Sequence, residues 1–109
     1  MAGRIERGEI RLVHFPEPDK ARPVLVLTRG SAIAYLSRVT VAPITSTIRG
    51  VPSEVVVGPD DGVKQPCAVN LHNVQTVAKD DIGRRVAQLG DGRMREVCRA
   101  LGFALGCEG

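Results

Sequence analysis

Short apolar runs, each interrupted by proline or glycine, recur along most of this chain. They are rich in valine, leucine and isoleucine, and each is shorter than a typical helix, so they predict β-strands. We expect strands at residues 8–15, 23–28, 38–44, 53–57, 67–71, 74–77 and 84–89. Six or seven short strands at this spacing indicate a barrel or a sandwich rather than a parallel sheet.

The first two predicted strands differ in how their faces should be covered. In the first, Ile10 and Leu12 occupy one face. Glu9 and Arg11 occupy the other, which predicts a half-buried strand. Residues 23–28 are apolar almost throughout, which predicts a central strand covered on both faces. Two prolines between these strands cannot donate to a ladder and should end the first one.

The C-terminal stretch changes to a helical period. Its apolar residues recur every three or four positions, and charged side chains lie mostly opposite them. The apolar residues are Met94, Val97, Cys98, Leu101 and Leu105. Asp91 is expected to cap the start of this helix and Gly106 to end it. The 109 residues suffice for one domain, residues 1–109, and we expect a β-barrel closed by a single amphipathic helix.

Charge, aromatic content and hydropathy limit the kinds of partner that this chain could bind and the kinds of protein that it could be. A formal net charge of +3 leans mildly toward a polyanionic partner. One tyrosine, two phenylalanines and no tryptophan exclude a set of rings on which several bases could stack. No apolar run approaches the roughly 20 residues of a membrane span, and the charged N-terminus does not resemble a signal peptide.

Cysteine usage argues against a disulfide framework or a zinc site. Cys67, Cys98 and Cys107 are odd in number and form no C-x-x-C pair. Reduced thiols fit a cytoplasmic protein. The sequence has no phosphate-binding glycine loop, zinc-protease motif or carboxylate cluster with metal spacing. We therefore expect neither a metal nor another cofactor.

Cationic and hydroxyl side chains near the ends of predicted strands are the first candidates for a functional site. Arg22 precedes Pro23, whose ring restricts Arg22 to an extended conformation, so its guanidinium could hold a phosphate from a fixed backbone. Thr45, Ser46 and Thr47 follow the third strand and could donate to phosphate oxygens. Taken singly, such residues are more often solvated charges or hydroxyls that bond their own backbone.

Amides and a histidine near the fifth and sixth strands form a second group. Its members are Asn70, His72, Asn73 and Gln75. If buried, they would satisfy backbone groups; if exposed, they could read the base edges of unpaired RNA. His14 and His72 are the only histidines, and they share no motif that marks an acid–base pair. The residues by themselves lead to a basic, mostly β domain with a candidate phosphate site.

Several segments, taken together, resemble the MazF/PemK family of toxins along nearly the whole chain, and most of all its actinobacterial branch. The matching segments are RGEI at 7–10, RPVLVL at 22–27, VAPITS at 41–46, NVQTV at 73–77 and DIGRRV at 81–86. The resemblance implies a mainly β (α+β) fold, an SH3-like barrel with a C-terminal helix. It also implies a homodimeric, metal-independent endoribonuclease toxin that cuts single-stranded RNA and is inhibited by the acidic segment of an antitoxin.

The family's motif assigns the catalytic roles to Arg22 and Thr45 of this chain. We expect RNA contacts from Ser46, Thr47, Arg49 and the second group. The loop before Arg22 is shorter than in the family, and Glu17 is its nearest acidic residue. The general base therefore stays open between Glu17, His14, His72 and water. Gln75 stands where the family often has arginine, and His72 where it often has an acidic residue.

Two other functions compete with RNA cleavage. A gyrase-poisoning toxin of the CcdB type would use the same barrel, act through its C-terminal helix, and need neither Arg22 nor Thr45. A catalytically degenerate SH3-like module would bind RNA without releasing a product. An RNA-cleavage assay separates both alternatives from the first interpretation.

Overall fold

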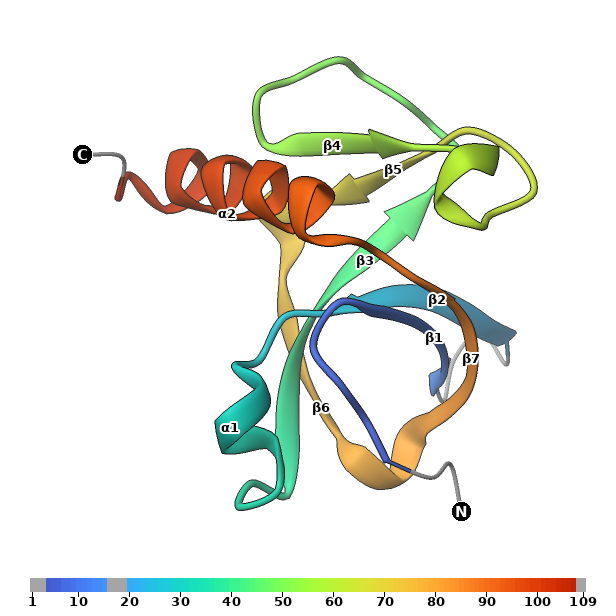
Figure 1. Cartoon of the computed structure of the whole chain (residues 1–109), viewed down its shortest axis with the longest axis vertical. Coiled ribbons are helices and arrows are strands. Elements are labelled where there is room, and N and C mark those ends of the chain that lie inside the picture. Colours follow the sequence, from blue (N-terminus) through green and yellow to red (C-terminus); the bar gives the residue numbers. More distant parts are fainter. Residues whose placement is uncertain (1–3, 16–19, 108–109) are drawn as a thin grey trace.

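The computed structural model describes residues 4–15 and 20–107 of the chain (Figure 1). Its seven strands are β1 Glu9–Phe15, β2 Lys20–Val26, β3 Arg38–Thr45, β4 Glu54–Val57, β5 Cys67–Asn70, β6 Gln75–Ala78 and β7 Ile82–Gln88. The helical elements are α1 Gly30–Ile33, α2 Asp91–Leu105 and the 3-10 turns η1 Pro59–Asp61, η2 Leu71–Asn73 and η3 Lys79–Asp81. This mostly β half-barrel with a C-terminal helix confirms the predicted fold class.

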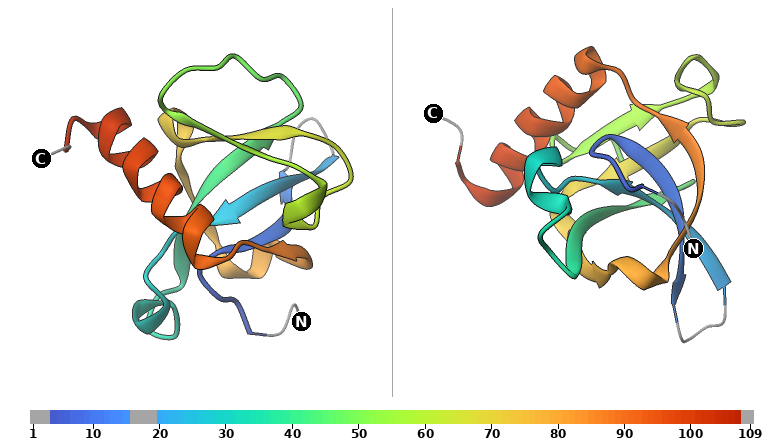
Figure 2. Two further views of the ribbon diagram at one scale, coloured as in Figure 1. Left: turned by 45° about the horizontal axis from the view of Figure 1, so that its top comes forward. Right: turned by 60° about the horizontal axis from the view of Figure 1, so that its bottom comes forward.

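Strand β3 joins the two halves of the sheet. The strand order is β4-β5-β3-β2-β1-β7, with β6 pairing β3, and the paired strands are antiparallel. Along its length β3 pairs first with β6, then with β2 and finally with β5. This change of partners lets the sheet curl, and both views in Figure 2 show α2 lying along one side of the curled sheet.

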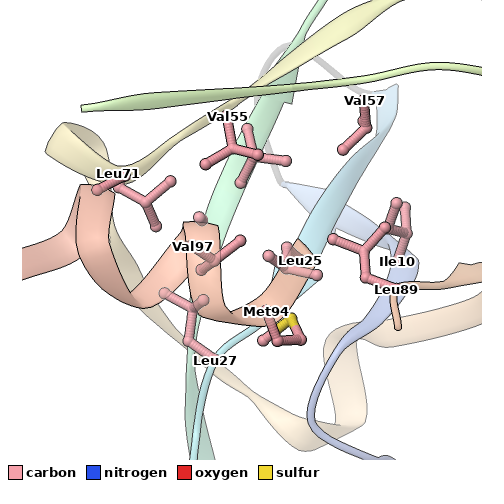
Figure 3. Packing of buried hydrophobic residues seen from close by; sticks show 12 residues of the cluster. Ile10, Leu25, Leu27, Val55, Val57, Leu71, Leu89, Met94 and Val97 are labelled. Carbon is pink, nitrogen blue, oxygen red and sulfur yellow. The ribbon is translucent and has the colours of Figure 1, made fainter. Parts of the chain in front are cut away.

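Two apolar clusters fill the molecule. One lies between the sheet and α2 and includes Leu25, Leu71 and Val97 (Figure 3). The other lies within the curl of β1, β2, β3 and β6 and includes Val24 and Val41. Val24 and Leu25 are consecutive, point to opposite faces and are both fully buried, which confirms β2 as a central strand covered on both sides. Each such side chain contributes about 1.5–3 kcal/mol through its burial.

Strand β1 is also buried on both faces, so the prediction of a half-buried strand is wrong. Glu9 is 4% exposed and Arg11 is 2% exposed, and Arg11 Nη1 lies 2.7 Å from Glu9 Oε1. Arg11 Nε donates to the carbonyl oxygen of Gly83 at 2.8 Å, and the N–H of Glu6 donates to Glu9 Oε1 at 2.9 Å. The two residues lie on one strand, two positions apart, but the pattern could not reveal that this face is buried, because the segments that cover it come from elsewhere in the chain.

The two ends of α2 differ in how well the sequence predicted them. Gly90 occupies the N-cap position and Asp91 is the first helical residue, so the expectation that Asp91 caps the helix is wrong. Its carboxylate lies in the first turn, where negative charge favours a helix. The predicted end is confirmed: Gly106 has a φ of 72°, and its N–H donates to the carbonyl oxygen of Phe103 at 3.1 Å.

The apolar face of α2 is only partly the predicted one. Met94 and Val97 are buried, but Cys98 and Leu105 are exposed, and the buried face continues through Ala100 instead. The sheet contacts only one side of the helix, so residues at the edge of the apolar face stay in solvent. Helix α1 was not predicted, because four residues are too few to show a period. None of the described helices is long and apolar enough to cross a membrane.

Candidate functional site

The two residues predicted to act on a phosphate, Arg22 and Thr45, lie on neighbouring strands. The last pair of the β2–β3 ladder is Val24 opposite Pro43. The pairing stops there, two residues short of both Arg22 and Thr45. Thr45 pairs with Ala68 of β5 and lines a hollow together with Pro23, the residue after Arg22. The fold therefore places Arg22 and Thr45 on adjacent strands, each two residues beyond the last pair of the ladder.

Arg22 is exposed, but its backbone is held on one side by β1, where it pairs with Val13. Pro23, the next residue, restricts Arg22 to an extended conformation. The guanidinium makes no hydrogen bond or ion pair with residues 4–15 or 20–107. A permanently charged donor therefore stands in solvent on a rigid strand, as a phosphate-binding residue requires.

Thr45 ends β3 and is half-buried. Its Oγ1 accepts the N–H of Thr47 at 3.1 Å, so the interpretation of this segment as a hydroxyl-rich turn describes its local structure correctly. Accepting that bond orients the hydroxyl and leaves its proton free to donate to another oxygen. Ser46 and Thr47 follow in an exposed bend. The turn thus presents one oriented hydroxyl and two exposed ones.

Asn70 shares a face of the sheet with Thr45. Thr45 pairs with Ala68 of β5, and Asn70 follows Ala68 by two residues. Asn70 is 9% exposed, however, and its Oδ1 accepts the N–H of His72 at 3.1 Å. The structural role that the sequence left open for Asn70, capping a turn, is therefore the one that its carbonyl oxygen performs.

The other members of the second group are exposed and lie away from Thr45. His72 and Asn73 belong to η2, at the opposite end of β5 from the Thr45–Ala68 pair. Gln75 pairs with Val41, four residues before Thr45 on β3. Arg49 is also exposed, and its backbone N–H donates to Glu54 Oε1 at 3.0 Å. In the described part of the chain, none of these side chains forms a hydrogen bond or ion pair with Arg22 or Thr45.

Strand pairing brings neither histidine beside the Arg22–Thr45 pair. His14 pairs with Ala21, so by alternation it leaves β1 on the face opposite to the one that Arg22 follows. His72 lies beyond the far end of β5. Glu17, the remaining candidate for the general base, lies outside the described residues.

A hollow of about 500 Å³ is lined by Thr45 and Ser46. Pro23 and Ile44 contribute to its apolar wall, and Lys64 and Arg84 bring positive charge to it. Lys64 lies in a loop without a motif, so no sequence pattern marks it as a functional residue. Arg84 carried no signal beyond its charge, so only the fold shows that both cations adjoin Thr45.

Cys67 also lines this hollow, and its chemistry is unfavourable for a nucleophile. Burial, helped by the negative charge of Asp61, raises the pKa of the Cys67 thiol. The thiol therefore stays protonated near neutral pH, and the protonated form is unreactive. Among the described residues, no group of three histidine, cysteine, aspartate or glutamate side chains could hold a metal ion.

The chain is similar to known toxins over almost its entire length. A family model described as PemK-like, MazF-like toxin of type II toxin–antitoxin system matches residues 6–105. Endoribonuclease MazF3 of Mycobacterium tuberculosis is 42% identical over 95 residues, which are 87% of this chain and 92% of that protein.

Solved structures with the same fold include two mycobacterial proteins. The M. tuberculosis toxin MazF-mt6 has a TM-score of 0.84 at 38% identity, covering 93% of this chain and 99% of that one. An endoribonuclease in complex with its cognate antitoxin, from a mycobacterial species, has a TM-score of 0.87 at 25% identity, covering 97% and 99%.

Proposed function

The chain belongs to the PemK-like, MazF-like toxins of type II toxin–antitoxin systems, and from this premise we propose that it is an endoribonuclease that cuts single-stranded RNA at a short sequence. The observation that supports the proposal for this chain is that Arg22 and Thr45 lie on adjacent strands, each two residues beyond the Val24–Pro43 pair. The family favours RNA cleavage over the gyrase-binding alternative. Growth inhibition would follow from the loss of translatable RNA.

The reaction needs no metal if the RNA supplies its own nucleophile. The 2′-oxygen attacks the adjacent phosphorus, the bond to the 5′-oxygen breaks, and the products carry a 2′,3′-cyclic phosphate and a 5′-hydroxyl. Negative charge grows on the non-bridging oxygens in the transition state. Arg22 stabilises that charge, and Thr45 donates a second hydrogen bond from a fixed backbone. A separate group takes the 2′-hydroxyl proton, and water supplies a proton to the departing 5′-oxygen. Water and Glu17 stay as candidates for the group that takes the proton, because strand pairing places neither histidine beside Arg22 or Thr45.

Two partners follow from the same proposal. The mycobacterial neighbour was solved with its cognate antitoxin, and we expect an antitoxin for this chain as well. A segment rich in acidic residues would suit a toxin of net charge +3. We also propose that the chain acts as a homodimer in the cytoplasm, where RNA is accessible to it, with the RNA groove running between the subunits.

The decisive experiment uses a labelled oligonucleotide that contains the cleavage sequence, found by mapping fragment ends of a long RNA. Cleavage should persist in EDTA. The same oligonucleotide with one 2′-deoxy sugar at the cut site should resist cleavage, because its nucleophile is missing. Cleavage of the deoxy substrate, or complete inhibition by EDTA, would contradict the mechanism. Binding without any product would instead favour the degenerate module.

A further inference from the structure

The side chain of Ser53 holds the ring of His72. Ser53 immediately precedes β4 and is 6% exposed, and its Oγ forms a hydrogen bond with Nδ1 of His72. The carbonyl oxygen of Ser53 also accepts the N–H of Leu71 at 2.9 Å. Ser53 thus fixes both the imidazole and the residue before it.

The backbone of His72 is fixed as well. Its N–H donates to Asn70 Oδ1 at 3.1 Å, and the preceding Leu71 is fully buried. His72 is nevertheless exposed. Ordering an exposed side chain costs conformational entropy, which a solvated surface residue normally avoids. A ring that is anchored at one nitrogen and open to solvent at its other edge is preorganised to contact a ligand.

The burial of Ser53 decides which nitrogen of His72 carries the proton. Within the described part of the chain, Nδ1 of His72 is the one hydrogen-bond partner of Ser53 Oγ. A buried hydroxyl that donates to nothing is strongly disfavoured, so the Ser53 proton points at Nδ1. A neutral imidazole has one N–H, and Nδ1 must then be the acceptor. The proton of the ring is therefore on Nε2, at the exposed edge.

We propose that Ser53 is a positioning residue that holds His72 in the Nε2–H tautomer, so that His72 donates a hydrogen bond to an acceptor atom of the RNA. This inference rests on the proposed function. The acceptor is either an oxygen or nitrogen on the edge of an unpaired base or a phosphate oxygen. In this tautomer the exposed nitrogen has no lone pair for the 2′-hydroxyl proton, so His72 does not act as the general base.

The tautomer can be measured without any RNA. Nitrogen-15 NMR of the imidazole rings of the full-length chain at pH 8 should show His72 mainly as the Nε2–H form. His14 serves as an internal reference in the same spectra, because its ring has no hydrogen bond to the described residues. In Ser53→Ala, His72 should become a mixture of both tautomers, and Ser53→Thr should restore the single form. A wild-type His72 with its proton on Nδ1 would overturn the inference.

The contribution of the His72 Nε2–H to RNA recognition is measured by sequencing the cleavage products of a randomised RNA pool. His72→Ala and Ser53→Ala should change the cleavage profile by roughly two- to tenfold, the range expected for one neutral hydrogen bond. The double variant should behave like His72→Ala alone, because Ser53 acts only through His72. Ser37→Ala, which removes an exposed hydroxyl elsewhere, is the matched control and should leave the profile unchanged.

The pattern of change identifies the acceptor. A change confined to one nucleotide position assigns a base edge, whereas a uniform loss across sequences assigns a phosphate. Additive effects of the two substitutions, or profiles identical to wild type, would overturn the positioning role. A wild-type chain that cleaves no RNA would contradict the proposed function instead, and the NMR result would still report whether Ser53 sets the tautomer.

Discussion

Arg93 of α2 donates two hydrogen bonds to the carboxylate of Asp61, from Nε to Oδ1 at 2.9 Å and from Nη2 to Oδ2 at 3.2 Å. Asp61 Oδ2 also accepts the N–H of Gly58 at 3.0 Å. The bonds from Arg93 hold the pKa of Asp61 below its ordinary value of 3.8, and the same pair raises the pKa of Arg93. This pair ties the loop that carries Lys64 to the start of α2.

The Asp61–Arg93 pair should make the stability of the fold depend on pH. The folded pKa of Asp61 is lower than the unfolded one, so the pair stabilises fully above about pH 4 and loses its effect as the pH falls through the folded pKa. We expect Asp61→Asn to lower the free energy of unfolding at pH 7 by about 1–2 kcal/mol, a value reduced for solvent screening because the Arg93 side chain is 35% exposed.

Urea unfolding at pH 7 and pH 3 measures this effect. The difference in the free energy of unfolding between wild type and Asp61→Asn should be smaller at pH 3. Asp60→Asn is the matched control, since Asp60 is the exposed neighbour in η1, and it should change stability little at either pH. If Asp61→Asn lowers the free energy of unfolding equally at both pH values, the charge of Asp61 is not what stabilises the loop.

Arg22 and Thr45 should be required for cleavage but not for folding. Arg22 is exposed and Thr45 is half-buried, so the substitutions remove a donor to the transition state and little packing. We expect Arg22→Ala and Thr45→Val each to lower kcat about a hundred- to thousandfold. Single-turnover cleavage of the mapped oligonucleotide measures the rate, and circular dichroism checks the fold.

A conservative variant and a control variant complete this test. Thr45→Ser keeps the hydroxyl and should retain most of the activity. Arg38→Ala removes an exposed arginine from the other end of β3 and should cleave like wild type. Full activity in both Arg22→Ala and Thr45→Val would refute the assigned roles.

The buried Glu9–Arg11 pair should be sensitive to the loss of one partner. Arg11→Met leaves the Glu9 carboxylate buried with its strongest neighbour removed, and we expect it to lower the free energy of unfolding by about 3–5 kcal/mol. Adding Glu9→Gln should recover part of the loss, because a neutral amide is easier to bury than a charge. Urea denaturation of the single and double variants measures the coupling. A double variant less stable than Arg11→Met would contradict this account.

Lys64 and Arg84 should contribute to RNA affinity through charge alone, because both adjoin Thr45 in the same hollow. If each contacts one phosphate, its replacement by alanine should reduce the slope of log affinity against log salt by about 0.7. Binding to a non-cleavable 2′-deoxy oligonucleotide at several salt concentrations measures the slope. Arg29→Ala, another exposed arginine, is the control, and an equal effect there would indicate general attraction rather than contacts in the hollow.

The seven strands, the central position of β2 and the glycine at the end of α2 could all be predicted, because each depends on local chemistry. A run such as residues 23–28 can be buried only by covering both its faces. Gly106 ends the helix because glycine adopts a positive φ without strain. The start of α2 was predicted one residue too late. An aspartate is favourable both at the N-cap and in the first turn of a helix, so local sequence does not show which of these two positions Asp91 occupies.

The sequence by itself determined which segments become strands and the helix, since hydrophobic period and turn residues act over a few positions. Only the tertiary structure decided what those segments bring together. Strand pairing placed Arg22 and Thr45 on adjacent strands, and burial by the rest of the fold turned Glu9 and Arg11 from expected surface charges into an internal pair. The bond between Ser53 and His72 is of the same kind. Contacts between residues distant in the chain depend on how the sheet curls, and no local pattern records that curvature.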